Sequence, residues 1–170
     1  LVYNYLLKNF TLLQFSRNGD FNFEQVSAEK AADSYDFAIM FTSILRSLKI
    51  PAKTLSGVLV DAELKTRSHW WNEFYIENFG WVPVDLALAN GLEYNSFHAV
   101  ENKKDYYFGN LDSQHIMFSS GWDIVKPSLT NSKIVYRPRS YSLQNIWEEA
   151  SAETDSYSSF WNVPEVLGLY

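Results

Sequence analysis

Apolar residues recur at helical spacing in two stretches near the start of the chain. The first lies within residues 1–15. The second begins near Asp33 or Ser34, repeats at steps of three and four residues, and is followed by Pro51. Acidic or hydroxyl side chains at the start of a helix and a proline after its end are typical helix borders. The pattern predicts a short N-terminal helix and a longer helix that begins at residue 33 or 34.

Beyond Pro51 the apolar pattern changes from helical to alternating. Strands are predicted over residues 53–60, 68–76, 81–84, 116–118 and 133–136, with a turn over residues 77–80. The strands on either side of this turn form an antiparallel hairpin, in which directly opposed residues point to the same face.

The composition indicates one packed domain without cysteine chemistry. The chain has 170 residues, 46% of them hydrophobic, which is enough for one buried core. The absence of Cys excludes disulfides, cysteine-ligated metals and a catalytic thiolate. The net charge of -6 disfavours a nucleic-acid partner, and without an apolar run of ~18 residues we expect no membrane contact from this segment. The histidines are scattered and no calcium-loop pattern occurs, so we expect no metal or other cofactor.

The balance of charge changes after Arg139, beyond which acidic residues occur without Lys or Arg. We therefore divide the chain into a domain over residues 1–139 and an acidic extension over residues 140–170. The extension is expected to contain a solvated helix around residues 143–150 that leads into a linker. An acidic tail that folds onto a partner is the alternative. The chain has no initiator Met and no signal-peptide pattern, so we interpret it as a domain of a longer protein.

Of the three histidines, His69 is the best candidate for chemistry. His98 lies in a polar loop and His115 precedes an apolar strand, where we expect structural or surface roles. His69 lies on the strand before the hairpin turn, and Asp85 follows the strand after it. If the hairpin register is even, the two side chains share a face. A carboxylate beside an imidazole fixes the tautomer that a general base requires.

A general base needs a nucleophile to activate, and Ser34 is the candidate. It stands where the longer helix begins, and a helix N-terminus stabilises developing negative charge. Ser34, His69 and Asp85 would then form a catalytic triad. The alternative is that Ser34 is an ordinary N-cap residue.

Several blocks of the sequence occur in a recognisable order. They are Ser34-Tyr35-Asp36-Phe37-Ala38, Leu45-Arg46-Ser47-Leu48-Lys49-Ile50-Pro51-Ala52-Lys53, Ser56-Gly57, His69-Trp70-Trp71-Asn72-Glu73-Phe74-Tyr75, Gly80-Trp81-Val82-Pro83-Val84-Asp85, and the later residues 107–112 and 118–124. Over residues 1–127 this order resembles the transglutaminase-like superfamily, and in particular a bacterial subgroup with Ser in the place of the catalytic Cys.

This resemblance implies a papain-like α+β fold, in which N-terminal helices, including the nucleophile helix, pack on an antiparallel sheet. It also implies acyl transfer on amides by a Cys–His–Asp triad, as in transglutaminases or peptidases. By position, Ser34 takes the place of Cys, His69 that of His and Asp85 that of Asp. Trp71 and Glu73 match a structural pair that follows the His.

Ser34 is the main departure from the family pattern. The family has Gly-x-Cys, and this chain has Ala32-Asp33-Ser34. A serine hydroxyl does not form the ion pair with histidine that a cysteine thiolate forms. Because the Gly is missing as well, a natural Ser is favoured over an engineered replacement of a catalytic Cys.

The sequence leaves two functions open. One is a degenerate or weakly active domain that binds a peptide, a protein or a cell-wall-like polymer in the inherited cleft, with Tyr35, Trp70 and Trp71 as candidate cleft residues. The other is an active amide hydrolase or acyltransferase that uses the Ser–His–Asp triad. We expect the pair of His69 and Asp85 to line an open cleft, as in the family. The alternative is that the two side chains form a buried hydrogen-bonded brace within a structural core. Family members of this kind are often exported or membrane-attached, so the resemblance favours an extracytoplasmic location.

Overall fold

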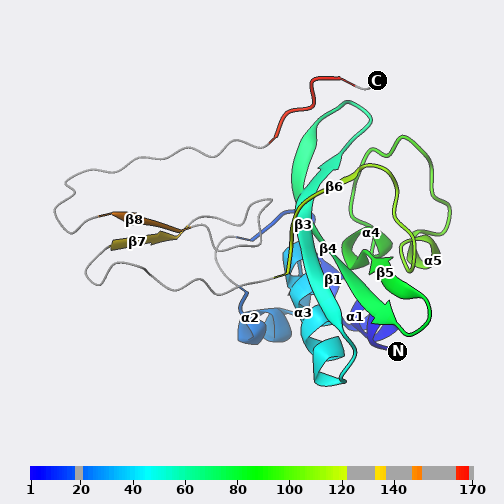
Figure 1. The fold of residues 1–170 in the computed structure, drawn as a ribbon, viewed down its shortest axis with the longest axis vertical. Helices are drawn as coiled ribbons and strands as arrows, with labels where there is room; N and C mark the ends of the chain where they lie inside the picture. Colours follow the sequence, from blue (N-terminus) through cyan, green and yellow to red (C-terminus); the bar gives the residue numbers. More distant parts are fainter. Residues whose placement is uncertain (18–20, 122–132, 137–146, 151–163, 169–170) are drawn as a thin grey trace.

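Helices pack against an antiparallel sheet (Figure 1) in the computed structural model, which describes residues 1–17, 21–121, 133–136, 147–150 and 164–168. The helices are α1 (Val2–Asn9), α2 (Phe23–Glu29), α3 (Ser34–Ser47), α4 (Leu86–Ala89) and α5 (Lys103–Tyr106). The strands are β1 (Thr11–Leu12), β2 (Ala31–Ala32), β3 (Ala52–Val60), β4 (Thr66–Ile76), β5 (Gly80–Val84), β6 (His115–Ser120), β7 (Lys133–Tyr136) and β8 (Trp147–Ala150). Figure 1 shows α3 against the sheet, so the α+β architecture implied by the resemblance is confirmed.

Reciprocal side-chain hydrogen bonds fix the N-terminus of α3. Asp33 is the N-cap residue: its carboxylate accepts from the backbone N–H of Asp36, and the Asp36 carboxylate accepts from the backbone N–H of Asp33. The backbone N–H of Arg17 also donates to Asp33, at 2.7 Å. The negative charge of this first turn suits the positive end of the helix. Ser34 is therefore the first residue of the helix and not its cap, so the N-cap interpretation is wrong.

The C-terminus of α3 closes in a left-handed turn. Lys49 has a φ angle of 64°, and the backbone N–H of Ile50 donates to the carbonyl oxygen of Leu45 at 2.9 Å. Glycine is common at such positions because a Cβ is unfavourable there. Pro51 follows and has no N–H for a further helical turn.

The main sheet is antiparallel, with the strand order β5-β4-β3-β6. Asn72 in β4 pairs with Val84 in β5, so the register is even, as the common face of His69 and Asp85 requires. The side-chain amide of Asn72 donates to the carbonyl oxygen of Ala38 in α3 at 2.8 Å. Because side chains alternate along a strand, α3 covers the face that carries Asn72 and the other face carries His69.

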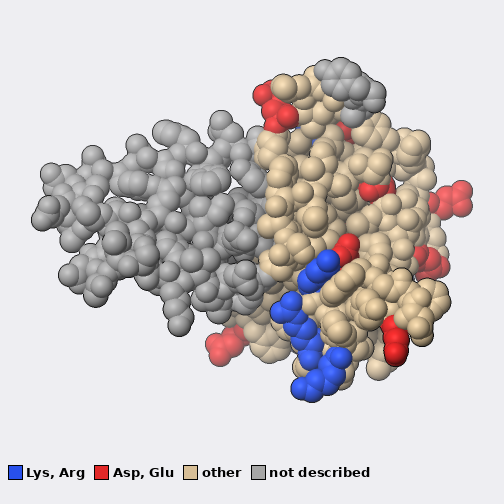
Figure 2. All heavy atoms as spheres, viewed as in Figure 1, with Lys and Arg blue, Asp and Glu red and all other residues tan. Residues whose placement is uncertain are grey.

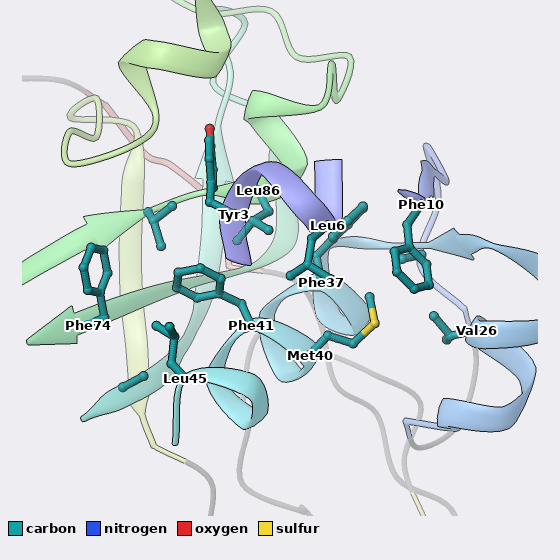
Figure 3. Close-up of a cluster of buried hydrophobic side chains, with 13 residues drawn as sticks. Tyr3, Leu6, Phe10, Val26, Phe37, Met40, Phe41, Leu45, Phe74 and Leu86 are labelled. Atoms are coloured by element: carbon teal, nitrogen blue, oxygen red, sulfur yellow. The ribbon is translucent and has the colours of Figure 1, made fainter. Parts of the chain in front are cut away.

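An apolar cluster holds α3 on the sheet. In Figure 3, Phe37, Met40 and Phe41 of α3 lie among side chains from α1, α2 and the sheet. Their neighbours include Tyr3, Leu6, Phe10, Val26, Leu45, Phe74 and Leu86. The rings of Phe41 and Phe74 meet edge to face with their centroids 6.0 Å apart. Burial of this cluster is the main stabilising contribution to the contact between α3 and the sheet.

The expected helix around residues 143–150 is wrong over its last four residues, Trp147–Ala150. These residues form β8, which pairs antiparallel with β7, whereas residues 143–146 lie outside the described residues. The β-branched Ile134 and Val135 favour a strand in β7, and pairing with it outweighs the local helical pattern. The β7–β8 pair lies apart from the main sheet in Figure 1. The domain boundary after residue 139 falls between the two strands and stays a prediction.

Gly57 allows β6 to approach β3 closely. It pairs with Met117, next to a register shift between Ser56 and Gly57. A Cβ at this position would lie 1.8 Å from the backbone oxygen of Ile116. Because β6 carries His115, the missing side chain at position 57 determines where His115 meets the rest of the sheet.

Charged side chains are unevenly distributed on the surface. On the face in Figure 2, the Lys and Arg side chains of the described residues form one row, whereas Asp and Glu side chains are spread around it. Lys53 Nζ lies 2.8 Å from the carboxylate of Glu73 and 4.4 Å from the ring centroid of Trp81.

Among the described residues, no helix has the length and apolar character needed to cross a membrane.

We expect Gly57→Ala to destabilise the protein more than Gly80→Ala. The Cβ at position 57 would meet backbone atoms of β6, so we expect a loss of about 3 kcal/mol. Gly80 has a φ of +93° and no atom within 4 Å of an added Cβ. Its cost is therefore that of the left-handed backbone alone, about 1–2 kcal/mol. Urea denaturation of both variants measures the difference, and equal losses would contradict the close approach as the reason for Gly57.

Candidate functional site

The carboxylate of Asp85 binds the side chain of His69. Asp85 Oδ2 lies 2.5 Å from His69 Nε2, and neither side chain is exposed. Asp85 follows β5 and caps α4, where its Oδ1 accepts from the backbone N–H of Leu88 at 2.9 Å. Because Nε2 of a neutral His69 donates to Asp85, its Nδ1 carries the lone pair. That atom is buried and has no hydrogen-bond partner among the described residues.

A second histidine binds the same carboxylate oxygen. His115 Nε2 lies 3.0 Å from Asp85 Oδ2, and His115 Nδ1 lies 2.8 Å from Asp112 Oδ1. The other oxygen of Asp112 accepts from the hydroxyl of Tyr107 at 3.0 Å. Asp112, His115, Asp85 and His69 therefore form one continuous row of hydrogen bonds, which we call the Asp–His cluster.

The hydrogen bonds indicate the charge of each member of the cluster. Both ring nitrogens of His115 face carboxylates, which only accept, so the ring donates twice and is a cation. Burial opposes this charge, yet Asp112 and Asp85 raise the pKa of His115 to about 9. Burial, together with His115 and Arg67, lowers the pKa of His69 against the attraction of Asp85. Burial also opposes ionisation of Asp85, but the two histidines hold its pKa below the ordinary value.

The donor atoms of the cluster also occur in metal sites. Ring nitrogens of His69 and His115 and an oxygen of Asp85 lie within 4.8 Å of one another. A tetrahedral zinc ion with bonds of about 2.0–2.1 Å keeps its ligand atoms roughly 3.3 Å apart. Here the ring nitrogens lie 2.5 and 3.0 Å from one oxygen, which is the spacing of direct hydrogen bonds. The geometry fits hydrogen bonds better than it fits a metal ion.

Ser34 is buried at the first position of α3, with 6% of its surface exposed. Within the described part of the chain, His69 Nδ1 has no hydrogen-bond partner, so Ser34 makes no hydrogen bond to this atom of the kind that a triad uses. The structure thus brings together His69 and Asp85. The role of Ser34 as the third member of a triad stays a prediction.

The three candidate cleft residues are buried. Tyr35, Trp70 and Trp71 are 6%, 1% and 2% exposed. The rings of Tyr35 and Trp70 meet edge to face at 5.4 Å on the side of the sheet that α3 covers. Trp71 stacks on His69 on the other side, with the ring planes 16° apart. All three therefore act in packing in this conformation.

The expectation of an open cleft beside His69 and Asp85 is wrong. Both side chains are fully buried, because the chain that carries Tyr107 and His115 lies over them: the backbone N–H of Asp85 donates to the carbonyl of Tyr107, and His115 reaches Asp85. An open apolar groove of about 460 Å³ lies elsewhere, beside the C-terminal half of α3. Its lining includes Tyr3, Leu45, Leu48, Phe74, Tyr75 and Phe108.

His115 and Asp112 are the site residues that sequence reasoning missed. A structural or surface role was expected for His115 because it precedes an apolar strand. The pairing of Leu59 with His115 across β3 and β6 is long-range, and no local pattern indicates it. An Asp three residues before a His is a weak signal, since this spacing often occurs without any contact.

Comparison with known proteins identifies the family. The structure is an α+β domain in which a helix packs on an antiparallel sheet and His and Asp lie at neighbouring strands. The model of the transglutaminase-like superfamily matches residues 1–86, which is just over half of the chain. The chain therefore belongs to the transglutaminase-like superfamily. The match ends just beyond Asp85, so the resemblance noted over residues 107–112 and 118–124 lies outside it.

One similar solved structure is that of a candidate cysteine protease from Cytophaga hutchinsonii. The two chains are 18% identical with a TM-score of 0.43, over 96% of this chain and 48% of the other. This chain thus spans about half the length of that protein. No curated protein matches the chain at a significant level. Membership of the superfamily rests on the family model.

We expect the stability of the protein to be highest near pH 6.5. The pKa of His115 is about 9 in the folded state, so its contribution is complete below the unfolded pKa of ~6.5 and is lost as the pH rises through 9. The pKa of His69 is lowered, so its contribution is present above ~6.5 and is lost as the pH falls. Each limb has a limiting slope of about 1.4 kcal/mol per pH unit. Urea unfolding at a series of pH values measures both limbs, and constant stability on the alkaline side would contradict a charged His115.

Asp85→Ala should cost more stability than His69→Ala. Without Asp85, the His115 cation stays buried beside Asp112 alone and α4 loses its cap, a cost of about 3–5 kcal/mol. Without His69, Asp85 keeps its bond to His115, and the loss is mainly that of ring packing, about 2 kcal/mol. Chemical denaturation compares the variants, with the exposed His98→Ala as a control that changes stability by no more than ~0.5 kcal/mol. The reverse order would show that Asp85 is not the centre of the cluster.

Proposed function

We propose that this transglutaminase-like domain has a Ser–His–Asp version of the family triad, in which acyl transfer is weak or lost. By the resemblance, Ser34 would take the position of the family Cys. The observation that carries the proposal is that Nδ1 of His69, which would receive the serine proton, is buried and has no partner in the described residues. A hydroxyl must lose its proton in the transition state, and this is efficient only when it is hydrogen-bonded to the base.

The chemistry that the triad would perform can be followed atom by atom. Ser34 Oγ attacks an amide carbonyl carbon, and its proton moves to His69 Nδ1 and from there to the leaving nitrogen. Asp85 keeps Nε2 of His69 protonated throughout. The acyl ester left on Ser34 is then released by water or by an amine. Because His69 and Asp85 are fully buried, access of a substrate to this pair is restricted, which supports slow turnover.

An active amide hydrolase or acyltransferase is the second candidate function, and the same buried nitrogen favours it. A buried acceptor without a partner is costly and is found at sites that act on a ligand or a proton. His69 is also held neutral, which is the protonation state that a serine nucleophile requires of its base. The two functions differ in whether Ser34 reacts.

The ligand in either case is proposed to be a peptide or a cell-surface polymer. Exposed aromatic side chains on the β4–β5 hairpin support this proposal. Tyr75 and Trp81 are 41% and 46% exposed, with ring centroids 5.6 Å apart. Such a surface suits stacking on a peptide or a sugar ring.

Ser34 should react slowly or not at all with a fluorophosphonate probe, because its hydroxyl is not hydrogen-bonded to His69. Labelling of the wild-type protein is compared with that of Ser34→Ala over time by mass spectrometry. Rapid labelling that is lost in Ser34→Ala would overturn weak catalysis and establish the active hydrolase instead.

Ser34→Cys tests the rest of the site with the same chain. If position 34 and the His69–Asp85 pair form one site, a thiol at the start of α3 should have a pKa at least ~1 unit below the 8.5 of free Cys. The pH dependence of its alkylation by iodoacetamide gives this value, with His69→Ala in the Ser34→Cys background as the matched control. A thiol that titrates like free Cys in both would show that position 34 and the pair no longer form a site.

A further inference from the structure

We propose that His115 is a positioning residue that sets the charge state of the His69–Asp85 pair: held between Asp112 and Asp85, it offsets the negative charge of Asp85 and keeps His69 neutral. The proposal concerns protonation and not turnover, so it stands whether or not Ser34 reacts.

The geometry of Asp85 Oδ2 is the first support. This single oxygen receives Nε2 of His69 at 2.5 Å and Nε2 of His115 at 3.0 Å. His115 cannot rotate away, because its other nitrogen is bound to Asp112 at 2.8 Å. Asp112 is itself fixed by Tyr107 and by the backbone N–H of Gln114. The direction and the charge of His115 are thus imposed by two carboxylates.

Burial is the second support, because it prevents water from screening these charges. The side chains of His69 and Asp85 are not exposed at all, and that of His115 is 3% exposed. The rings of the two histidines lie 5.8 Å apart. Two imidazolium rings at this distance without solvent would repel each other strongly, so a charged His115 opposes a second proton on His69.

The other groups around the two rings do not reverse this assignment. His69 faces Asp85, His115 and the cation Arg67, which also opposes its protonation. His115 faces Asp112, Asp85 and His69, and among the described residues its ring also contacts the rings of Trp71 and Tyr107. Burial raises the pKa of Tyr107 well above its ordinary value, so this neighbour stays uncharged.

A neutral His69 suits the residue at position 34. A cysteine nucleophile forms a thiolate beside an imidazolium, so its histidine carries the proton before the reaction begins. A serine keeps its own proton and needs an unprotonated nitrogen to receive it. An imidazolium at His115 holds His69 in the state that fits Ser34 rather than Cys.

The test is a titration of the imidazole nitrogens by NMR on the intact chain. The chain has 3 histidines, so ¹⁵N-histidine labelling gives three sets of signals, and the exposed His98→Gln assigns one set by its loss. In the wild type, His115 should show two protonated nitrogens up to about pH 8, whereas His69 should show the neutral form protonated on Nε2 at pH 7. A His115 that is neutral at pH 7 would overturn the proposal.

Asp112→Asn tests the coupling, because it is nearly isosteric and removes one of the two charges that hold the proton on His115. We expect the pKa of His115 to fall by about 1–2 units and that of His69 to rise by about one unit. His115→Gln should also raise the pKa of His69. If His69 titrates as in the wild type in both folded variants, His115 has only a structural role. If neither variant folds, the wild-type titration alone decides. Fluorophosphonate labelling reports on Ser34 separately, so failure of one proposal does not imply failure of the other.

Discussion

The hydrogen bonds of the buried Asp85 carboxylate hold together the elements on one side of the sheet. The carboxylate joins β4 through His69, β6 through His115 and the start of α4 through a backbone N–H. A charge removed from water is tolerated only when donors surround it, so all three elements have to be in place together. The chain between Tyr107 and His115 supplies the last donor and at the same time closes this face to solvent.

Local patterns predicted the parts of the fold that are short-range. The spacing of apolar residues gave α3 because its apolar side chains pack on one sheet, and Asp33 and Pro51 mark its borders. The common face of His69 and Asp85 followed from the pleat of a single hairpin, which requires only an even register. Such inferences succeed because the residues involved belong to one helix or one hairpin, whose local geometry fixes how they are placed relative to one another.

The features that sequence reasoning missed are long-range. His115 looked like an ordinary residue before a strand, and it becomes part of the site only because β6 pairs with β3 beside Gly57. The sequence of Trp147–Ala150 is compatible with a helix, but in the structure this segment pairs with β7 as a strand. The burial of His69 and Asp85 likewise depends on the segment that lies over them, which is the chain that carries Tyr107 and His115. Each outcome is decided by a contact between distant parts of the chain, and one sequence does not contain a local signal for it.

The late position of β6 in the chain has a consequence for folding kinetics. The strands β3, β4 and β5 follow one another along the chain and are joined by short turns. By contrast, α4 and α5 separate β6 from β5 along the chain, and β6 pairs with β3. Contacts that close short loops form first, so Asp85 remains hydrated while the hairpins assemble. When β6 docks, His115 has to change from an ordinary imidazole to a cation, and near neutral pH the docking step therefore takes up a proton from the solvent. Completion of the fold is thus coupled to the acidity of the compartment in which the chain folds.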